Sequence, residues 1–287
     1  MSTLSLLVEG SACSWGKLYD SQQMQQIIRS IISFANAHLS MSATNKVLLF
    51  VYANGLQKKL VFNSQKQTGS CNDHSLAMVT ALRAALRENA ESEDLNSSSP
   101  LAAVLSHSMC HMKANEDKNE ASTSADEKSS ATSPSFTNGR IVIVSMTTDF
   151  GSEHGSLMNL FFSAAKQGVC VDVACMGEAS PLLQQAADIT NGQFVQIDSP
   201  QHLLKYLMIN LLSPPTVRSV FPQASLKSVD YRASCACHHE LVSSGWACSV
   251  CLSVLCQFVP ICRVCKAVFK LPNLPMKKNL KRKAVAK

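Results

Sequence analysis

Hydrophobic positions along the first 212 residues fall into two alternating patterns. Short unbroken runs rich in Val, Ile and Leu predict strands with both faces buried. These runs cover residues 4–8, 47–52, 56–62, 141–144, 169–174 and 194–197. Between them, apolar residues recur at intervals of three and four, which predicts helices with one face against a sheet. Asn54-Gly55, between the second and third runs, predicts a tight two-residue hairpin turn.

Local start and stop residues mark the predicted helices. Asp20 or Ser21 can cap the first helix, and Asp73 the next one. Gly168 and Gly192 are placed to end two later helices. Three further helices begin at serine–proline pairs, where a missing N–H costs nothing. These pairs are Ser99-Pro100, Ser180-Pro181 and Ser199-Pro200.

Six strands alternating with about six helices predict a doubly wound, Rossmann-like α/β sheet with one antiparallel hairpin over residues 1–213. The connectivity matches the von Willebrand factor A-like (vWA-like) variant of that architecture. Residues 113–138 carry nine Ser/Thr, eight charges and one large apolar residue, a composition typical of a disordered loop. Residues 214–229, rich in proline, are predicted to link this domain to a module at 230–271.

The module at 230–271 contains seven of the twelve cysteines. Cys248-Ser-Val-Cys251 and Cys262-Arg-Val-Cys265 each place two thiolates at adjacent corners of a tetrahedron, the arrangement that Zn²⁺ prefers. Disulfides would require an oxidising compartment, and the first ten residues lack a secretory signal. We therefore predict structural zinc on Cys248, Cys251, Cys262 and Cys265.

A second arrangement adds Cys235, Cys237 and Cys256, with His238 as a further ligand, in a cross-braced finger of the RING type. The Cys235-Ala-Cys237 spacing fits the first ligand pair of a RING poorly. One zinc site is therefore favoured, and the second site stays open. A module of this size rarely folds without a metal or a disulfide.

Net charge adds one feature to this picture. The chain carries +6, and residues 277–287 alone hold six Lys/Arg and no acidic residue. The rest is close to neutral, which argues against a broad nucleic-acid surface. The basic tail at 272–287 has the composition of a nuclear import signal, of a solvated tail or of a weak phosphate contact. No apolar run approaches the length of a membrane span, so we predict a soluble protein.

A magnesium-binding A-type domain carries Asp-x-Ser-x-Ser after its first strand. Here that position holds Glu9-Gly-Ser11-Ala-Cys13, and a cysteine suits Mg²⁺ poorly. Asp149 lies late for the acidic residue after the fourth strand, and Ser98 or Ser99 could replace the usual Thr. We expect no Mg²⁺ at this site.

The sequence contains no phosphate loop, nucleophile elbow or zinc-protease motif either. The sequence therefore supports neither catalysis nor a small-molecule substrate.

Three runs around the cysteines resemble one family. They begin at Val229-Asp-Tyr-Arg-Ala-Ser-Cys-Ala-Cys-His-His, Trp246-Ala-Cys-Ser-Val-Cys and Pro260-Ile-Cys-Arg-Val-Cys-Lys. The chain resembles the smaller vWA-like subunit of the general transcription and DNA repair factor TFIIH, which ends in a C4 zinc finger. The resemblance continues upstream through Phe161-Phe-Ser-Ala-Ala-Lys-Gln, Leu182-Leu-Gln-Gln-Ala-Ala-Asp and residues 4–17. The segment 113–138 departs from it.

The resemblance implies a non-catalytic scaffold of the TFIIH core, in the nucleus, acting in RNA polymerase II initiation and nucleotide excision repair. Its A-like domain would bind the RING-like finger of the larger vWA-like subunit, which engages the repair helicase. The family's zinc ligands carry over to Cys248, Cys251, Cys262 and Cys265. Contact with DNA would be indirect or weak.

Two other classes of function compete with this interpretation. A RING-type ubiquitin ligase built on the cysteine module would bind two zinc ions and transfer ubiquitin from a charged E2 enzyme. A DNA-binding zinc ribbon would bind duplex DNA with an affinity that falls steeply with salt even without the basic tail.

Overall fold

The computed structural model describes residues 2–16, 21–56, 59–66, 71–91, 100–120, 139–147, 150, 153–218, 220, 229–238 and 240–269. The chain separates into two compact units, Met1–Tyr231 and Arg232–Lys287. The basic tail, Asp149 and the Ser98–Ser99 pair lie outside the described residues. No helix in the described part has the length and apolarity to cross a membrane.

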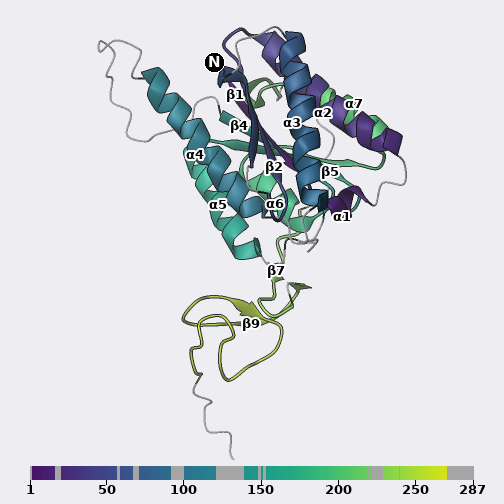
Figure 1. Ribbon diagram of the computed structural model, residues 1–287. Helices are drawn as coiled ribbons and strands as arrows, with labels where there is room; N and C mark the ends of the chain where they lie inside the picture. The colour runs from purple at the N-terminus through teal and green to yellow at the C-terminus, as the bar shows by residue number, and fades with distance from the viewer. Residues whose placement is uncertain are drawn as a thin grey trace, which may run out of the picture. The chain divides into compact units, whose positions relative to one another are not determined.

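The Met1–Tyr231 unit is built on one six-stranded sheet (Figure 1). Its strands are β1 (Thr3–Glu9), β2 (Lys46–Tyr52), β3 (Leu60–Asn63), β4 (Gly139–Ser145), β5 (Cys170–Met176) and β6 (Phe194–Ile197). They lie in the order β3-β2-β1-β4-β5-β6, and only β3 runs antiparallel to its neighbour. This topology is the vWA-like variant of the doubly wound fold, so the fold prediction is confirmed.

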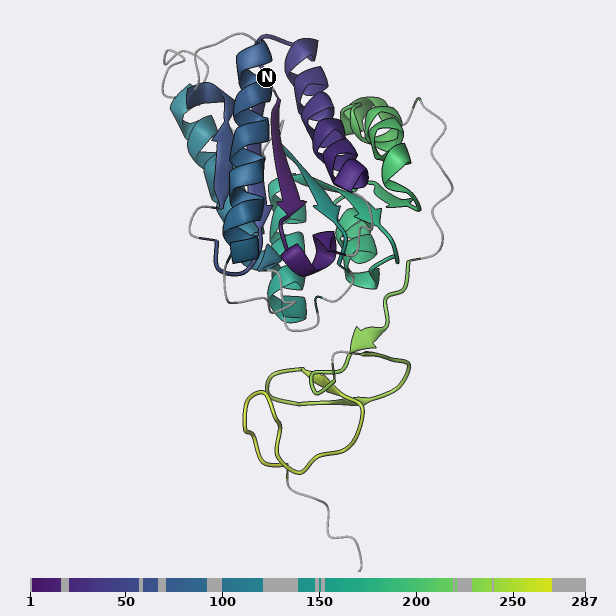
Figure 2. The same ribbon diagram turned by 45° about the vertical axis from the view of Figure 1, so that its right-hand side comes forward.

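Helices cover both faces of the sheet (Figures 1 and 2). One layer contains α2 (Ser21–Met41), α3 (Cys71–Glu91), α7 (Leu203–Tyr206) and its π-helical continuation η4 (Leu207–Leu211). The other contains α4 (Leu101–Glu120), α5 (His154–Gln167) and α6 (Pro181–Ile189). Successive strand side chains point to opposite faces, so Leu6 packs with the first layer and Leu7 with the second.

The hairpin between β2 and β3 differs from the tight turn that Asn54-Gly55 predicts. The strand β3 begins at Leu60, not at Leu56. Leu56 is buried in the core, and the Asn54 carbonyl accepts a hydrogen bond of 2.7 Å from Asn89 Nδ2. Gly55 has φ +74°, as expected after Asn in a turn. Burial of Leu56 thus pulls the loop into the core and lengthens it.

Two predicted segment boundaries are corrected. The helix α4 continues to Glu120, eight residues into the segment predicted to be disordered, because each residue added to an existing helix gains a backbone hydrogen bond. Residues 121–138 lie outside the described part. The predicted linker at 214–229 begins with a helix, α8 (Pro215–Arg218), whose last residue is buried. That part of the chain belongs to the α/β unit.

The two glycines predicted to end helices, Gly168 and Gly192, have different roles. Gly168 adopts the left-handed conformation after α5, with φ +75°, as predicted. After α6, Asn191 and not a glycine adopts the left-handed conformation, with φ +55°. Gly192 is required for space instead, because a Cβ there would lie 1.9 Å from the carbonyl oxygen of Val171.

The Arg232–Lys287 unit contains only short strands in its described part. They are β7 (Ala233–Ser234), β8 (Leu241–Val242), β9 (Trp246–Ala247) and β10 (Val254–Leu255). Among the described residues of this unit, four are buried: Cys235, Cys248, Leu255 and Cys262. Three of these four are thiols, so the centre of the unit is built from cysteine and not from an apolar core.

Candidate metal centre

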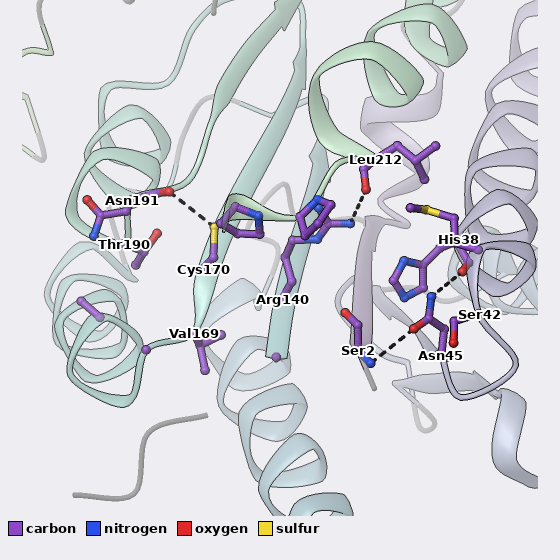
Figure 3. A pocket seen from close by; sticks show the side chains of 16 residues that line it. Ser2, His38, Ser42, Asn45, Arg140, Val169, Cys170, Thr190, Asn191 and Leu212 are labelled. Carbon is purple, nitrogen blue, oxygen red and sulfur yellow. Dashed lines mark hydrogen bonds between the residues drawn. The ribbon is translucent and has the colours of Figure 1, made fainter. Parts of the chain in front are cut away.

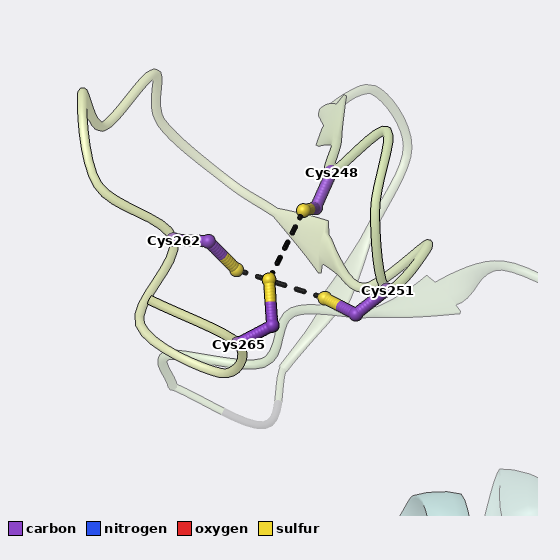
Figure 4. A group of neighbouring side chains, drawn as sticks. All are labelled: Cys248, Cys251, Cys262 and Cys265. Atoms are coloured by element: carbon purple, nitrogen blue, oxygen red, sulfur yellow. Dashed lines mark hydrogen bonds between the residues drawn. The ribbon is translucent and has the colours of Figure 1, made fainter. Parts of the chain in front are cut away.

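The four cysteines of the two Cys-x-x-Cys motifs converge on one point (Figure 4). All four sulfurs lie within 4.8 Å of one another. The Sγ atoms of Cys248 and Cys265 are 3.6 Å apart, and those of Cys251 and Cys262 are 3.7 Å apart. A regular tetrahedron with metal–sulfur bonds of about 2.3 Å has edges of about 3.8 Å. The cluster therefore has the size and donor set to hold a metal ion.

Backbone hydrogen bonds shape the two turns that present these thiols. The N–H of Leu252 donates to the carbonyl of Cys248 at 2.9 Å, and the N–H of Lys266 donates to that of Cys262 at 3.0 Å. Leu252 and Lys266 have φ of +60° and +61°. This conformation is uncommon for residues other than glycine, and both turns place it directly after the second cysteine. The two motifs are thus the same turn used twice.

Hydrogen bonding also favours thiolate at two of these cysteines, Cys251 through Ser253 and Cys262 more strongly. The backbone N–H of Cys265, together with Ser253 and the N–H of Val264, lowers the pKa of Cys262 to about 6 against the opposing effect of burial. The N–H of Ala267 lowers the pKa of Cys265, but burial and three neighbouring sulfurs raise it to about 12. A thiolate at one cysteine therefore disfavours deprotonation of the neighbouring cysteines. A bound cation is needed to keep all four deprotonated.

A second group of metal-type ligands comprises Cys235, His238 and Cys256. The Sγ of Cys256 lies 3.3 Å from His238 Nδ1, and that of Cys235 lies 3.9 Å from the same atom. Cys237, which the sequence placed in this group, is not part of it. His238, which entered only as a further candidate, takes its place.

At the carboxyl end of β1, the carboxylate of Glu9 occupies the position of the A-type metal motif. Its Oε2 accepts hydrogen bonds from the backbone N–H groups of Met146 at 2.7 Å and Thr147 at 2.9 Å, and from the Ser145 hydroxyl at 3.2 Å. Its Oε1 accepts from the hydroxyls of Ser14 and Thr147. Glu9 is fully buried. Five donors from the protein surround a carboxylate that would otherwise face a cation.

The other residues of that motif differ in exposure. Ser11 is buried and begins the short helix α1 (Ala12–Trp15), whereas Cys13 is exposed. The Trp15 indole Nε1 donates to the Glu9 carbonyl at 2.7 Å. The motif therefore functions in this structure as a hydrogen-bonded link between β1, α1 and the loop after β4.

The amino end of the sheet carries a cavity of about 540 Å³ (Figure 3). Its polar lining includes His38, Arg140, Cys170 and Asn191, and hydrogen bonds within the chain use most of these groups. The Arg140 Nη2 donates to the Leu212 carbonyl at 3.3 Å, and the Cys170 thiol donates to the Asn191 carbonyl at 3.6 Å. Burial raises the pKa of Cys170 to about 12, and the charge of Asp172 adds to this. Burial and the raised pKa both disfavour the reactive thiolate form of Cys170.

Comparison with known proteins covers both units. A family model described as "Transcription factor Tfb4" matches residues 1–266. The chain belongs to the Tfb4 family. This match includes the α/β unit and all four cysteines of the converging cluster.

Relatives of this chain occur in a yeast and in a slime mould. The chain is 25% identical over 290 residues to the general transcription and DNA repair factor IIH subunit tfb4 of Schizosaccharomyces pombe, covering 97% of this chain and 92% of the relative. It is 37% identical over 142 residues to general transcription factor IIH subunit 3 of Dictyostelium discoideum, covering 49% of this chain and 38% of that protein.

A solved structure matches the α/β unit. The crystal structure of the TFIIH p34 N-terminal domain aligns with a TM-score of 0.58 and 22% identity, covering 72% of this chain and 96% of that one. At this identity the match shows the fold alone.

Proposed function

We propose that this protein is a non-catalytic structural subunit of the TFIIH core, acting in transcription initiation by RNA polymerase II and in nucleotide excision repair. The Tfb4 family match across both units carries this proposal. The S. pombe relative, a transcription and DNA repair factor IIH subunit, aligns over almost the whole chain. We accordingly place the protein in the nucleus.

In this proposal Cys248, Cys251, Cys262 and Cys265 hold one structural Zn²⁺. The donor set supports zinc, because four thiolates in a closed tetrahedron are typical of structural zinc sites. The unit buries one aliphatic side chain among its described residues, Leu255. Metal binding would then supply the free energy of folding that an apolar core supplies elsewhere.

The environment of Glu9 supports a role without catalysis at the sheet edge. Doubly wound proteins bind their ligands beyond the carboxyl ends of the strands, and Glu9, Ser145 and Thr147 lie at that edge. Their hydrogen bonds are directed at one another. We infer that this edge serves protein contacts and binds no Mg²⁺.

The partner in this proposal is the larger vWA-like TFIIH subunit with a RING-like finger, and its docking surface would lie on the α/β unit. Each helix layer offers an exposed apolar side chain: Phe162 on α5, 56% exposed, and Ile209 on η4, 65% exposed. Such side chains are candidates for burial at an interface. Contact with DNA would be indirect or weak.

Affinity purification of the tagged full chain from nuclear extract, followed by mass spectrometry, tests the proposal. We expect the TFIIH core subunits, including the larger vWA-like subunit. Recovery of no TFIIH subunit at native salt would contradict the proposal.

Two variants locate the contact. Phe162→Asp and Ile209→Asp should leave the melting temperature unchanged, and at least one should lose the larger subunit. The exposed Lys166→Gln on α5 changes the net charge by the same single unit and is the control. Retention of the partner by both variants would exclude these two positions as the docking surface.

A further inference from the structure

The Arg232–Lys287 unit contains the same hairpin three times. We define the first hairpin as residues 233–242, the second as 246–255 and the third as 260–269. In each, the residue before the leading cysteine pairs with the residue six positions after that cysteine. These pairs are Ser234 with Leu241, Ala247 with Val254, and Ile261 with Val268.

The tips of the three hairpins share a backbone hydrogen bond. In each, the N–H of the leading cysteine donates to the carbonyl five residues later. These bonds are Cys235 to Glu240 at 2.8 Å, Cys248 to Ser253 at 2.9 Å, and Cys262 to Ala267 at 2.8 Å. The second and third hairpins present metal-type ligands from the first and fourth residues of the tip. Among its described residues, the first hairpin shares the strand pair and this tip hydrogen bond.

The first and fourth residues of the first tip are Cys235 and His238. Cys237 occupies the third position, which Val250 and Val264 occupy in the other two tips, with 69% and 54% exposure. The N–H groups of Cys237 and Val250 both donate to the Sγ of their leading cysteine, at 3.4 Å. The repeat therefore assigns the second ligand position to His238 and gives Cys237 a backbone role.

Cys256 completes this group from the end of the second hairpin. Its N–H donates to Cys235 Sγ at 3.2 Å, and the N–H of Ala236 donates to the Val254 carbonyl at 2.8 Å. A tetrahedral zinc site with bonds of about 2.3 Å to sulfur and 2.05 Å to nitrogen has sulfur–nitrogen edges of about 3.6 Å. The observed separations from His238 Nδ1, 3.3 and 3.9 Å, lie on either side of this value.

We propose that Cys235, His238 Nδ1 and Cys256 supply three ligands of a second zinc site in this unit. The site rests on the hairpin repeat and the ligand distances. It does not depend on the TFIIH assignment. Along the chain, its ligands alternate with those of the four-cysteine cluster, because Cys248 and Cys251 fall between His238 and Cys256. The two sites therefore interlock the three hairpins.

Metal content of the full chain tests the second site. Protein purified under reducing conditions, with loosely bound metal removed, should contain two zinc ions per chain by elemental analysis. Cys256→Ser and His238→Ala should each contain one, whereas Cys237→Ser should keep two. One zinc in the unchanged protein would overturn the proposal. Loss of a zinc ion from Cys237→Ser would overturn the ligand assignment.

Cobalt substitution distinguishes a lost ligand from a misfolded unit. Thiolate-to-cobalt charge-transfer absorption grows with the number of bound sulfurs, so the second site should contribute less than the four-cysteine cluster. His238→Cys should restore two metal ions and raise this absorption above that of the unchanged protein. If His238→Cys binds only one metal ion, as His238→Ala is expected to, position 238 is not a ligand and the proposal fails.

Discussion

Arg218 and Asp172 form a buried two-point ion pair. Both guanidinium nitrogens lie 2.6 Å from the two carboxylate oxygens. The Nε of Arg218 also donates to the Ser213 carbonyl at 3.1 Å, and the Nε of Arg140 lies 3.9 Å from the same carboxylate. Asp172 belongs to β5 and Arg218 is the last residue of α8, so this pair holds α8 on the sheet.

Removing one partner of this pair should destabilise the α/β unit strongly. Arg218→Ala leaves the buried Asp172 carboxylate with the more distant Arg140 as its one cation among the described residues, and we expect a loss of about 3–5 kcal/mol in the free energy of unfolding. Urea denaturation followed by circular dichroism at 222 nm measures this loss. Arg83→Ala, an exposed arginine on α3, is the control and should stay within about 0.5 kcal/mol. Equal stability of the two variants would contradict the role of the pair.

Acid should destabilise the α/β unit through His38. Burial, and then the charge of Arg140, lowers the pKa of His38 to about 4 from 6.5, and its Nε2 has no hydrogen-bond partner among the described residues. Between these pH values His38 is protonated in the unfolded chain and neutral in the folded chain. Stability should therefore fall as pH drops from about 6.5 toward 4, by roughly 3 kcal/mol from this group.

The variant His38→Asn isolates this contribution. Its free energy of unfolding should depend less on pH than that of the unchanged protein between pH 6.5 and 4. The exposed His202→Asn serves as the matched control and should keep the full dependence. Parallel pH profiles for His38→Asn and the unchanged protein would show that His38 takes up its proton in the folded state.

Metal removal should unfold the Arg232–Lys287 unit alone. A zinc chelator, or Cys251→Ser, removes the closed tetrahedron that replaces an apolar core there. The fluorescence of Trp246 should change, because its ring packs edge-on against Phe258 with centroids 5.4 Å apart. Circular dichroism at 222 nm should persist, since the described helices all lie in the other unit. Cys110→Ser, at an exposed cysteine of α4, should change neither signal.

Glu9 should matter for stability and not for magnesium binding. Glu9→Gln replaces a carboxylate oxygen by a donor that faces other donors, and we expect a loss of about 2 kcal/mol or more. Addition of millimolar Mg²⁺ should leave the melting temperature of the unchanged protein where it was. A rise that disappears in Glu9→Gln would reveal a working metal site at this edge.

Much of the fold could be predicted from local patterns. The predicted strand runs overlap all six strands of the main sheet, and Pro181 and Gly168 stand at the helix boundaries where the sequence placed them. Local conformation is encoded by residues close in the chain, so periodicity and capping predict it. Errors arose where distant contacts overrode local preference. Leu56 is drawn into the core and opens the Asn54-Gly55 turn, and Arg218 holds the start of the predicted linker on the sheet.

The candidate site divides in the same way. The paired Cys-x-x-Cys motifs predicted the four-cysteine cluster, because the spacing within each turn is a local property. The sequence favoured Cys237 over its neighbour His238 as a ligand, because Cys237 carries a thiol. The register of the hairpin, in which Ser234 pairs with Leu241, decides that His238 and not Cys237 lies beside Cys235 and Cys256 as a ligand. The repeat of hairpins at 13- and 14-residue intervals from Cys235 to Cys248 and Cys262 could have indicated this register.

The sequence by itself determined the strand–helix alternation, the separation into an α/β unit and a cysteine module, and the four converging thiols. Tertiary structure alone decided that Glu9 is enclosed by donors from a loop 138 residues away and that Arg218 pairs with an aspartate 46 residues away. Residues near in the chain constrain one another through backbone geometry. Charges and donors far apart in the chain become partners only when the packed sheet brings them together.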